Sequence, residues 1–589
     1  MRVTLIEPRA PGRHVYSNVK MPRLGLPLLG TMLRSLGHKV RVLFATVSEI
    51  KVADLADADV VGISATTSTS LEAYHLARFA RSLGKTVVMG GPHVTFLPDE
   101  ALEHCDYVVR GEAETTFGPL LECIRKQQSP ADMNGISYRE QGRIVHNPPA
   151  DWIHPDAHPR PDLSLISGYK ASTYPVMTSR GCPFDCSFCS VTSMFGRKFR
   201  CRDTELVLEE LRHYKGKNVF FIDDNFTANP ARSKALLREM IQRQDGPASW
   251  YAQVRTDAAR DPELLDLMRR SGCSMVFIGM ESVNPETLAR FNKRQGVEDI
   301  EYAVRAFHKY GILVHGMFVL GSDDDTVTTV RETADFAIRN RIDSIQFLVL
   351  TPLPGTRDYE ELDRTGRLLT KDWSLYDGHH VVYQPARMSA LELQVETIRA
   401  MKKFYSARRI TENFMITGKA SATFRAIGYW GVRKWEKDNL WFNEYLRGLT
   451  APAAVQMLPA RLRLAKSIET FKMKHFRYVS FERLMDLEIF EDNGGLMVNL
   501  KGYLNGFTLS ETFRTLRGCL PSCSLDLTIN IEQVSFASEE ALKKFIVKMN
   551  QLASQARSVQ IKFPHQPNLG AKLQSALEKY NCPVPRFEF

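Results

Sequence analysis

Short apolar runs alternate with amphipathic stretches from Met1 to about Lys126. The runs have the length of buried strands, and the stretches repeat apolar residues at the three- and four-residue spacing of helices. This alternation predicts right-handed crossovers and an α/β fold with a parallel, doubly wound, Rossmann-like sheet over residues 1–135. The predicted strands are Arg2–Ile6, Val40–Phe44, Asp59–Ser64 and Thr86–Met89, and the predicted helices are Gly25–Leu36 and Ser70–Leu83.

A proline-rich segment separates this pattern from a second one. Residues 136–170 have few long apolar runs, which predicts a linker. Six strand and helix units follow within residues 171–388 and predict a partial (β/α)6 TIM barrel with its chemistry at the carboxyl ends of the strands. The predicted barrel strands are Tyr174–Ser179, Asn218–Ile222, Ser249–Val254, Ser274–Gly279, Leu313–Phe318 and Ser344–Leu350.

The last two hundred residues have a different pattern. Residues 389–480 read as mainly helical, and residues 481–589 read as a small α/β domain. The strands predicted there are Leu496–Tyr503, Leu525–Ile531 and Ser558–Phe563, and the helices are Leu509–Leu516, Glu539–Gln555 and Gly570–Tyr580.

Positive charge is concentrated in the helical segment. Residues 401–480 contain 16 Lys and Arg against 5 Asp and Glu, whereas the whole 589-residue chain has a net charge of +10. Six aromatic residues lie among these charges between Ala426 and Arg447, a mixture typical of helices in a membrane interface. A helical extension that packs its aromatic residues on the barrel is an equal alternative. Nucleic acid is disfavoured, because no RNA-binding module is evident.

The first residues form a strand-like run without the features of a signal peptide, and no apolar stretch reaches the roughly 18 residues that span a bilayer. We therefore expect a cytoplasmic protein, held peripherally on the inner membrane face if the basic segment binds lipid. In that compartment the ten cysteines are expected to be thiols or metal ligands rather than disulfides.

Three of the cysteines carry the strongest chemical signal. Cys182, Cys186 and Cys189 follow the first barrel strand within eight residues. A cubic iron–sulfur cluster takes thiolate ligands, normally four, so three close cysteines can leave one iron open for a substrate or cofactor. A structural zinc site is the alternative, but it needs a fourth ligand, and no second cysteine pair follows at suitable spacing.

The CxxxCxxC motif, with Phe188 before its last cysteine, resembles the signature of the radical S-adenosylmethionine (AdoMet) superfamily. The resemblance implies that AdoMet chelates the open iron of a [4Fe-4S] cluster. One electron from an external flavodoxin- or ferredoxin-type donor then cleaves AdoMet to methionine and a 5′-deoxyadenosyl radical, which abstracts a hydrogen atom.

Further segments along the barrel resemble the AdoMet-binding elements of that superfamily. They lie at successive strand ends, in the family's order. The AdoMet-binding residues that the resemblance implies are Phe188, Asp223, Asp224, Asn225, Gln253, Arg255, Gly279, Glu281, Ser282 and Leu320.

The N-terminal domain resembles the cobalamin-binding domain of the B12-dependent radical AdoMet group, through residues 88–95 and 106–114. In that group the corrin lies across the carboxyl edge of the sheet, where open α/β sheets bind ligands. None of the fifteen histidines stands in the Asp-x-His-x-x-Gly motif that supplies cobalt with a ligand in other cobalamin domains. The residues implied at the cobalamin site are Ser64, Thr66, Gly90, Gly91, Pro92, His93, Gly111 and Glu112.

These resemblances predict a cobalamin-dependent radical enzyme that methylates or cyclises an unactivated carbon of an apolar, membrane-associated substrate, such as a polycyclic isoprenoid or a porphyrin-type lipid. A radical AdoMet enzyme without cobalamin and a non-catalytic interaction protein with a degenerate barrel are the alternatives. The last domain weakly resembles a STAS domain, which implies a protein partner.

Overall fold

The computed structural model describes most of the chain as far as residue 449 and the strands of the last domain. The described residues are 1–10, 21–48, 50–169, 171–416, 419–449, 475–480, 485–492, 495–504, 513, 526–536, 545, 547–548, 558–562 and 587–588. Most of residues 1–443 form one compact unit, and residues 444–589 belong to a second.

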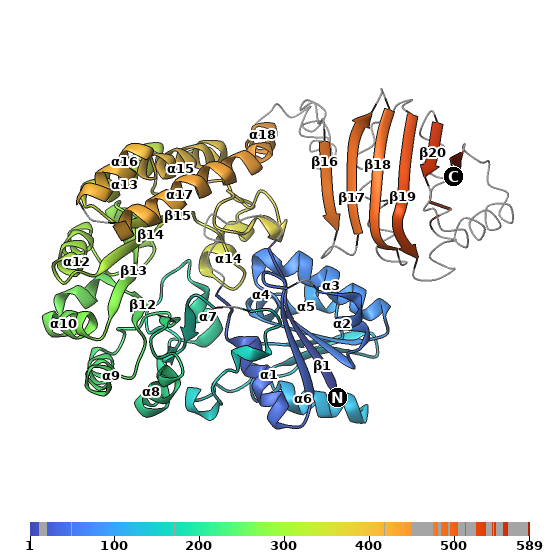
Figure 1. The fold of residues 1–589 in the computed structure, drawn as a ribbon, viewed down its shortest axis with the longest axis horizontal. Helices are drawn as coiled ribbons and strands as arrows, with labels where there is room; N and C mark the ends of the chain where they lie inside the picture. Colours follow the sequence, from blue (N-terminus) through green and yellow to red (C-terminus); the bar gives the residue numbers. More distant parts are fainter. Residues whose placement is uncertain are drawn as a thin grey trace. The chain divides into compact units, whose positions relative to one another are not determined.

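The N-terminal domain is built on a seven-stranded sheet with the strand order β2-β1-β3-β4-β5-β6-β7. Its first strand, β1, is labelled in Figure 1. The first five strands are parallel, and Val3 of β1 pairs with Val40 on one side and Val60 on the other. Its elements are β1 (Arg2–Glu7), α1 (Gly25–Ser35), β2 (Lys39–Phe44), α2 (Val52–Ala56), β3 (Val60–Ser64), α3 (Ser70–Ser82), β4 (Thr86–Gly90), α4 (Pro92–Phe96), α5 (Pro98–Leu102), β5 (Tyr107–Val109) and α6 (Phe117–Lys126). The predicted Rossmann-like fold is confirmed.

The sheet extends into the predicted linker, which is a correction to its boundary. Strands β6 (Ile136–Glu140) and β7 (Arg143–His146) form a hairpin that adds to β5 in antiparallel orientation. The hairpin turns at Gln141 and Gly142, which both have positive φ, as a two-residue hairpin turn requires. The predicted boundary of the domain was placed at residue 135 because the prolines that follow indicated a linker, and the turn at Gln141 and Gly142 was overlooked.

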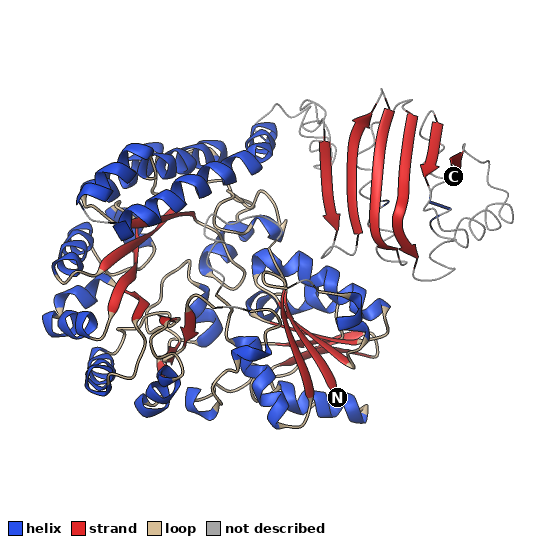
Figure 2. Ribbon diagram, viewed as in Figure 1, coloured by secondary structure: helices blue, strands red, loops and turns tan. Residues whose placement is uncertain are grey.

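The second domain contains a six-stranded parallel sheet with the order β15-β14-β13-β12-β11-β8, as a partial barrel requires. Figure 2 shows its strands in red and its helices in blue. Its strands are β8 (Tyr174–Val176), β11 (Asn218–Phe221), β12 (Ser249–Val254), β13 (Cys273–Glu281), β14 (Leu313–Leu320) and β15 (Ser344–Val349). Its helices are α7 (Ser190–Phe195), α8 (Thr204–Arg212), α9 (Pro230–Arg243), α10 (Pro262–Arg270), α11 (Pro285–Arg290), α12 (Val297–Lys309), α13 (Val327–Arg339) and α14 (Arg357–Arg364). A short antiparallel pair is formed by β9 (Ser179–Arg180), which follows β8 closely, and β10 (Arg200–Cys201), which follows α7.

The basic segment begins as predicted, with helices that pack on the barrel. They are α15 (Ala390–Phe404), α16 (Ala407–Ile416), α17 (Lys419–Asp438) and α18 (Leu440–Leu449). The Tyr405 hydroxyl donates to the carbonyl of Ile345 in β15 at 2.6 Å, and buried Arg425 of α17 donates to the carbonyl of Ile342 at 2.6 Å. The end of the segment differs from the prediction, because residues 475–480 form a strand.

The last domain contains a six-stranded mixed sheet of β16 (His475–Ser480), β17 (Met485–Asp492), β18 (Gly495–Leu504), β19 (Asp526–Phe536), β20 (Ser558–Lys562) and β21 (Phe587–Glu588). Strands β18, β19 and β20 were predicted, whereas β16, β17 and β21 were not. The helices predicted at 509–516, 539–555 and 570–580 lie almost wholly outside the described residues. Within the described part of the chain, no helix has the length and apolar character to cross a membrane.

Candidate functional site

The three cysteines of the motif lie on one loop at the carboxyl end of the first barrel strand. The loop runs from β9 to α7, and Cys189 is the residue that precedes the first turn of α7. All three side chains are half-buried free thiols. The sequence prediction of a cysteine loop at this edge of the barrel is therefore matched by the structure.

Contacts from several elements fix the shape of this loop. The hydroxyl of Thr192 donates to the carbonyl of Phe184 at 3.0 Å, and the amide of Asn292 donates to the carbonyl of Asp185 at 2.9 Å. Phe188 packs edge-on against Phe291, with ring centroids 4.8 Å apart. The loop is thus held by the segment that follows α11, and the aromatic residue of the motif serves this packing.

The thiols lie close enough to influence one another. Burial raises the pKa of each, that of Cys189 to about 12, and the charge of Cys186 raises the pKa of both Cys182 and Cys189 further. Nearby Arg255 and Lys293 lower the pKa of Cys186. A bound cation removes thiol protons, so three half-buried thiols on one short loop suit a metal cluster better than an apolar core.

Among the described residues, no three His, Cys, Asp or Glu side chains meet as ligands of one metal ion. A cubic cluster binds each thiolate to a different iron, so its ligands stand further apart than those of a single zinc ion. The loop therefore fits a cluster by the spacing of its cysteines and the burial of its thiols.

The acidic segment after β11 divides into structural and site-facing residues. Asp223 is fully buried and accepts hydrogen bonds from the backbone N–H groups of Thr178 and Ser179 at 2.7 and 3.0 Å. The amide oxygen of Asn225 accepts from Thr227 within its own turn. Burial, with a contribution from the charge of Asp223, raises the pKa of Asp224 to about 6. Of the three residues of this segment that were predicted to bind AdoMet, only Asp224 lines the neighbouring cavity and influences the pKa of Cys182.

A buried ion pair marks the carboxyl end of β13. Lys293 donates to the carboxylate of Glu281 at 2.5 Å, and both side chains are 8% exposed. Glu281 has a φ of 62°, in the left-handed region that non-glycine residues adopt at a cost. A side chain at Gly279 would collide with this pair, because its Cβ would lie 2.7 Å from the Lys293 Nζ. A larger residue at 279 would therefore displace the Glu281 and Lys293 side chains from this pair.

Arg255 lies beside the same pair. Its guanidinium donates to the carbonyl of Lys293 and stacks 3.8 Å from the ring centroid of Phe184 in the cysteine loop. Glu281, Lys293 and Arg255 all influence the pKa of the Cys186 thiol, which places charged groups of both signs next to the cysteine loop. Sequence analysis missed Lys293, which follows α11 and carries no motif of its own.

The remaining predicted AdoMet residues lie near the barrel mouth in less direct roles. Gln253 is half-buried near the end of β12, and its carbonyl accepts the N–H of Phe226. The hydroxyl of Ser282 accepts the N–H of Asn284 at 3.0 Å. Leu320 is the buried last residue of β14.

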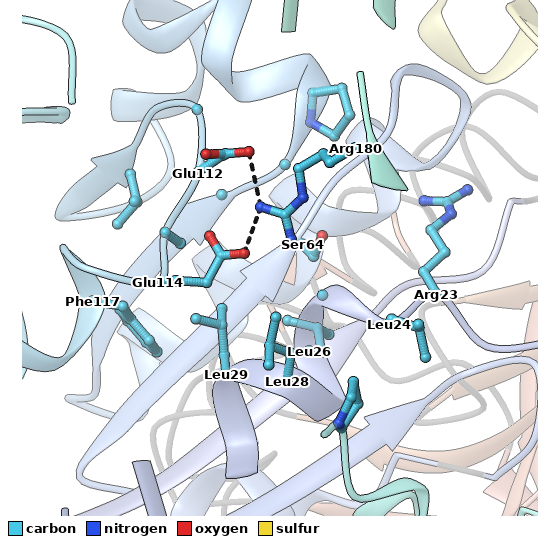
Figure 3. Close-up of a pocket in the computed structure, with 18 of the residues that line it drawn as sticks. Arg23, Leu24, Leu26, Leu28, Leu29, Ser64, Glu112, Glu114, Phe117 and Arg180 are labelled. Atoms are coloured by element: carbon cyan, nitrogen blue, oxygen red, sulfur yellow. Dashed lines mark hydrogen bonds and ion pairs between the residues drawn. The ribbon is translucent and has the colours of Figure 1, made fainter. Parts of the chain in front are cut away.

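A cavity of about 370 Å³ lies at the carboxyl edge of the N-terminal sheet and reaches the first barrel strands (Figure 3). Seven of the eight residues predicted to bind cobalamin line it, namely Ser64, Thr66, Gly90, Gly91, Pro92, Gly111 and Glu112. Gly91 has a φ of 98°, and a Cβ there would lie 2.6 Å from the carbonyl oxygen of Ala65. The bare backbone at this edge is what close approach of a large flat ligand requires.

His93 is the exception. It is buried in α4, does not line the cavity, and lies 3.5 Å from Glu100 and 5.2 Å, between ring centroids, from Trp373. Trp373 in turn donates to Glu100 at 2.8 Å. The structure therefore corrects the assignment of His93 to the cobalamin site, because its ring packs between the two domains.

The wall of the cavity contains an ion-pair network that the sequence analysis did not anticipate. Arg180 pairs with Glu112 at 2.8 Å and with Glu114 at 2.7 Å, and Arg200 pairs with Glu112 at 2.7 Å. Figure 3 shows both carboxylates directed at the Arg180 guanidinium. Burial opposes ionisation, but hydrogen bonds from Arg200 and Arg180 hold the pKa of Glu112 below its usual value. The Glu112 carboxylate is therefore ionised and bound by Arg180 and Arg200.

Apolar side chains form the floor of the cavity, between α1 and the sheet. They include Leu5, Leu26, Leu28, Leu29, Val88 and Phe117. A polar upper wall near the cysteine loop and an apolar floor suit a ligand with a flat polar-edged ring and an apolar part. These residues fit cobalamin.

Comparison with known proteins gives two domain matches. Residues 176–337 match the radical SAM superfamily, and residues 15–121 match the B12 binding domain.

The similar proteins include named methyltransferases and a solved radical enzyme. The chain is 37% identical over 377 residues to an uncharacterized methyltransferase of Pyrococcus horikoshii, covering 60% of this chain and 81% of that protein. It is 31% identical over 364 residues to the bacteriochlorophyllide d C-12(1)-methyltransferase of Chlorobaculum tepidum, covering 61% and 77%. The cobalamin-dependent S-adenosylmethionine radical enzyme OxsB, solved with aqua-cobalamin bound, shares the fold with a TM-score of 0.57 at 17% identity, covering 82% of this chain and 76% of that one.

Proposed function

Since this chain belongs to the B12-dependent radical SAM enzymes, whose cofactors are AdoMet, a [4Fe-4S] cluster and cobalamin, we propose that it methylates or cyclises an unactivated carbon of an apolar substrate. Cys182, Cys186 and Cys189 hold the cluster in this proposal. The bound cofactors supply radical and methyl-transfer chemistry, and the protein supplies binding, orientation and exclusion of water.

One observation carries the proposal. The cavity at the edge of the N-terminal sheet is lined from one side by Gly90 and Gly91 and from the other by Arg180 and Asp224, next to the cysteine loop. A ligand on the sheet edge would therefore face the cluster, which is the arrangement that two cofactors acting on one substrate need.

The charged groups around Cys186 have distinct parts in this proposal. AdoMet carries a carboxylate and an ammonium group, so Arg255 and Lys293 are suited to the first and Glu281 to the second. Asp224 lines the cavity, where its carboxyl can accept a hydrogen bond from a ligand between the cluster and the cavity. These assignments follow from charge and position.

The apolar nature of the substrate is supported by a relative, because the C. tepidum protein is named for methylating a bacteriochlorophyllide. A flat polycyclic substrate, of tetrapyrrole or isoprenoid type, would shed its water shell on entering an enclosed site.

The exposed face of α17 supports association with a membrane surface. Phe424, Ile427 and Trp430 are 39%, 46% and 72% exposed at helical spacing, and exposed lysines at 434 and 437 continue the same stripe. Other aromatic residues of the segment, such as Trp435, are buried against the barrel. An apolar stripe continued by lysines is suited to anionic lipid.

Co-sedimentation with liposomes tests the lipid contact. Replacing Ile427 and Trp430 with serine should abolish binding to vesicles containing phosphatidylserine, whereas Leu206→Ser, at an exposed leucine of α8, should leave it intact. Absence of binding by the unsubstituted protein would remove the membrane part of the proposal.

Anaerobic reconstitution tests the proposed function. The protein is supplied with iron, sulfide and hydroxocobalamin, its absorption spectrum is recorded, and 5′-deoxyadenosine is measured after AdoMet and a flavodoxin-type reductant are added. We expect cluster and corrin bands together with nucleoside. Cluster absorption without a corrin band would favour a cobalamin-free enzyme, and absence of both would favour an interaction protein that acts through its last domain.

A further inference from the structure

Arg180 connects the wall of the cavity to the cysteine loop. Only Gly181 separates it from Cys182. A side chain at Gly181, whose φ is 84°, would collide with the carbonyl oxygen of Lys198, so the backbone there is closely packed. The residues on the other side of Arg180 are fixed as well, because Asp223 accepts their N–H groups. The position of Arg180 therefore determines the position of Cys182.

The partners of Arg180 come from the N-terminal domain. Glu112 and Glu114 follow β5, just after Gly111, whose N–H donates to the Thr95 hydroxyl at 3.0 Å at the cavity edge. Glu112 also accepts the N–H of Ile153 at 3.0 Å, so its carboxylate has little freedom to move. Arg180, at the start of the cysteine loop, thus forms ion pairs with residues of the same backbone segment that lines the cavity.

The network is balanced in charge and almost dry. Two arginines face two glutamates, and the four side chains are between 2% and 12% exposed. Arg180 and Arg200 are register partners on β9 and β10, so both guanidiniums approach Glu112 from one short sheet. A planar guanidinium can bond both carboxylates in fixed directions, which an ammonium group cannot reproduce.

We propose that Arg180 is a positioning residue that sets the separation between bound cobalamin and the cluster. This inference rests on the proposed function, because it needs both groups to bind. Arg180 acts through Cys182 on one side and through Glu112 and Glu114 on the other.

Other contacts keep the two domains together without Arg180. Trp373, from the barrel side, donates to Glu100 of α5 and packs edge-on against His93. Gly355 fits against the ring of Phe96, where a Cβ would collide. Loss of Arg180 should therefore shift the cavity relative to the cluster while the domains stay joined.

The test compares Arg180→Gln, Arg180→Lys and Glu114→Gln with the unsubstituted protein, all reconstituted with cluster and cobalamin. Arg331→Gln is the control, since Arg331 makes a two-bond ion pair with Glu396 on the far side of the barrel helices. Electron paramagnetic resonance of the reduced cluster beside cob(II)alamin reports their separation through spin coupling. Methylated or cyclised product and 5′-deoxyadenosine are measured in parallel.

Arg180→Gln should retain the cluster and corrin bands, lose or change the spin coupling, and form about 100-fold less product per 5′-deoxyadenosine, as a displacement of about 1 Å would cause. Arg180→Lys should retain part of the spin coupling and part of the product yield. Arg331→Gln should change neither of these quantities. Glu114→Gln leaves Arg180 in place and should change the spin coupling and the product yield in the same direction, but by less. It serves as the test if Arg180→Gln fails to fold.

Unchanged spin coupling in both Arg180→Gln and Glu114→Gln would overturn the inference while leaving the proposed function intact. Absence of a corrin band in the unsubstituted protein would instead overturn the proposed function, and the positioning role would fall with it.

Discussion

Removal of the Lys293 ammonium group tests the description of the site at β13. In Lys293→Met the Glu281 carboxylate keeps its place in a nearly dry setting but loses the partner that is 2.5 Å away. Breaking a buried pair on one side costs about 3–5 kcal/mol, since the remaining charge is uncompensated. For a domain of this size, that corresponds to a fall of roughly 10 °C in the unfolding temperature.

The assay is thermal unfolding of the metal-free protein, followed by circular dichroism. The matched control is the double variant Glu281→Gln/Lys293→Met, which removes both charges and should recover most of the loss. Equal unfolding temperatures for Lys293→Met and the unsubstituted protein would refute the reasoning. A double variant less stable than Lys293→Met would also refute it.

Three further predictions follow from other parts of the structure. Cys186→Ala should abolish 5′-deoxyadenosine formation after reconstitution, and continued formation, measured by chromatography, would mean that the cluster has other ligands. Gly91→Ala should weaken cobalamin binding and lower the free energy of unfolding by about 1–3 kcal/mol, because its φ of 98° and the Ala65 backbone exclude a side chain; spectroscopic titration with hydroxocobalamin showing unchanged affinity would contradict this. Burial lowers the pKa of His315 to about 4. As the pH falls, the unfolded chain therefore binds a proton before the folded protein does. The free energy of unfolding should fall by up to about 1.4 kcal/mol per pH unit as the pH is lowered from roughly 6.5 to 4. Urea unfolding at several pH values should show a shallower slope for His315→Gln than for the parent, and equal slopes would argue against the assignment.

The parts of the fold that the sequence predicted are those with a local periodic signal. The first four strands of the N-terminal domain and all six barrel strands are apolar runs bounded by polar loops, and the structure has them within a few residues. The cysteine loop was also predictable, because its ligands lie within eight residues of one another. Gly91 could be placed at the ligand edge since it directly follows a strand.

The parts that the sequence did not predict depend on pairing between distant residues. Arg180 and Glu112 are 68 residues apart, and Trp373 and Glu100 are 273 apart, so no period or spacing links them. His93 follows a Gly-Gly-Pro turn that suggested a ligand site, but the direction of its side chain was decided by Glu100 and the barrel. The hairpin at 136–146 had a local signal, the two-residue Gln141-Gly142 turn, and was overlooked.

The central claim is that Cys182, Cys186 and Cys189 hold a [4Fe-4S] cluster with one iron left open for AdoMet. Electron paramagnetic resonance of the reduced, anaerobically reconstituted protein tests it most directly, with spectra recorded before and after AdoMet is added. The account predicts a [4Fe-4S] signal whose g values shift when AdoMet binds. Zinc in place of iron, or a cluster signal that AdoMet leaves unchanged, would contradict it.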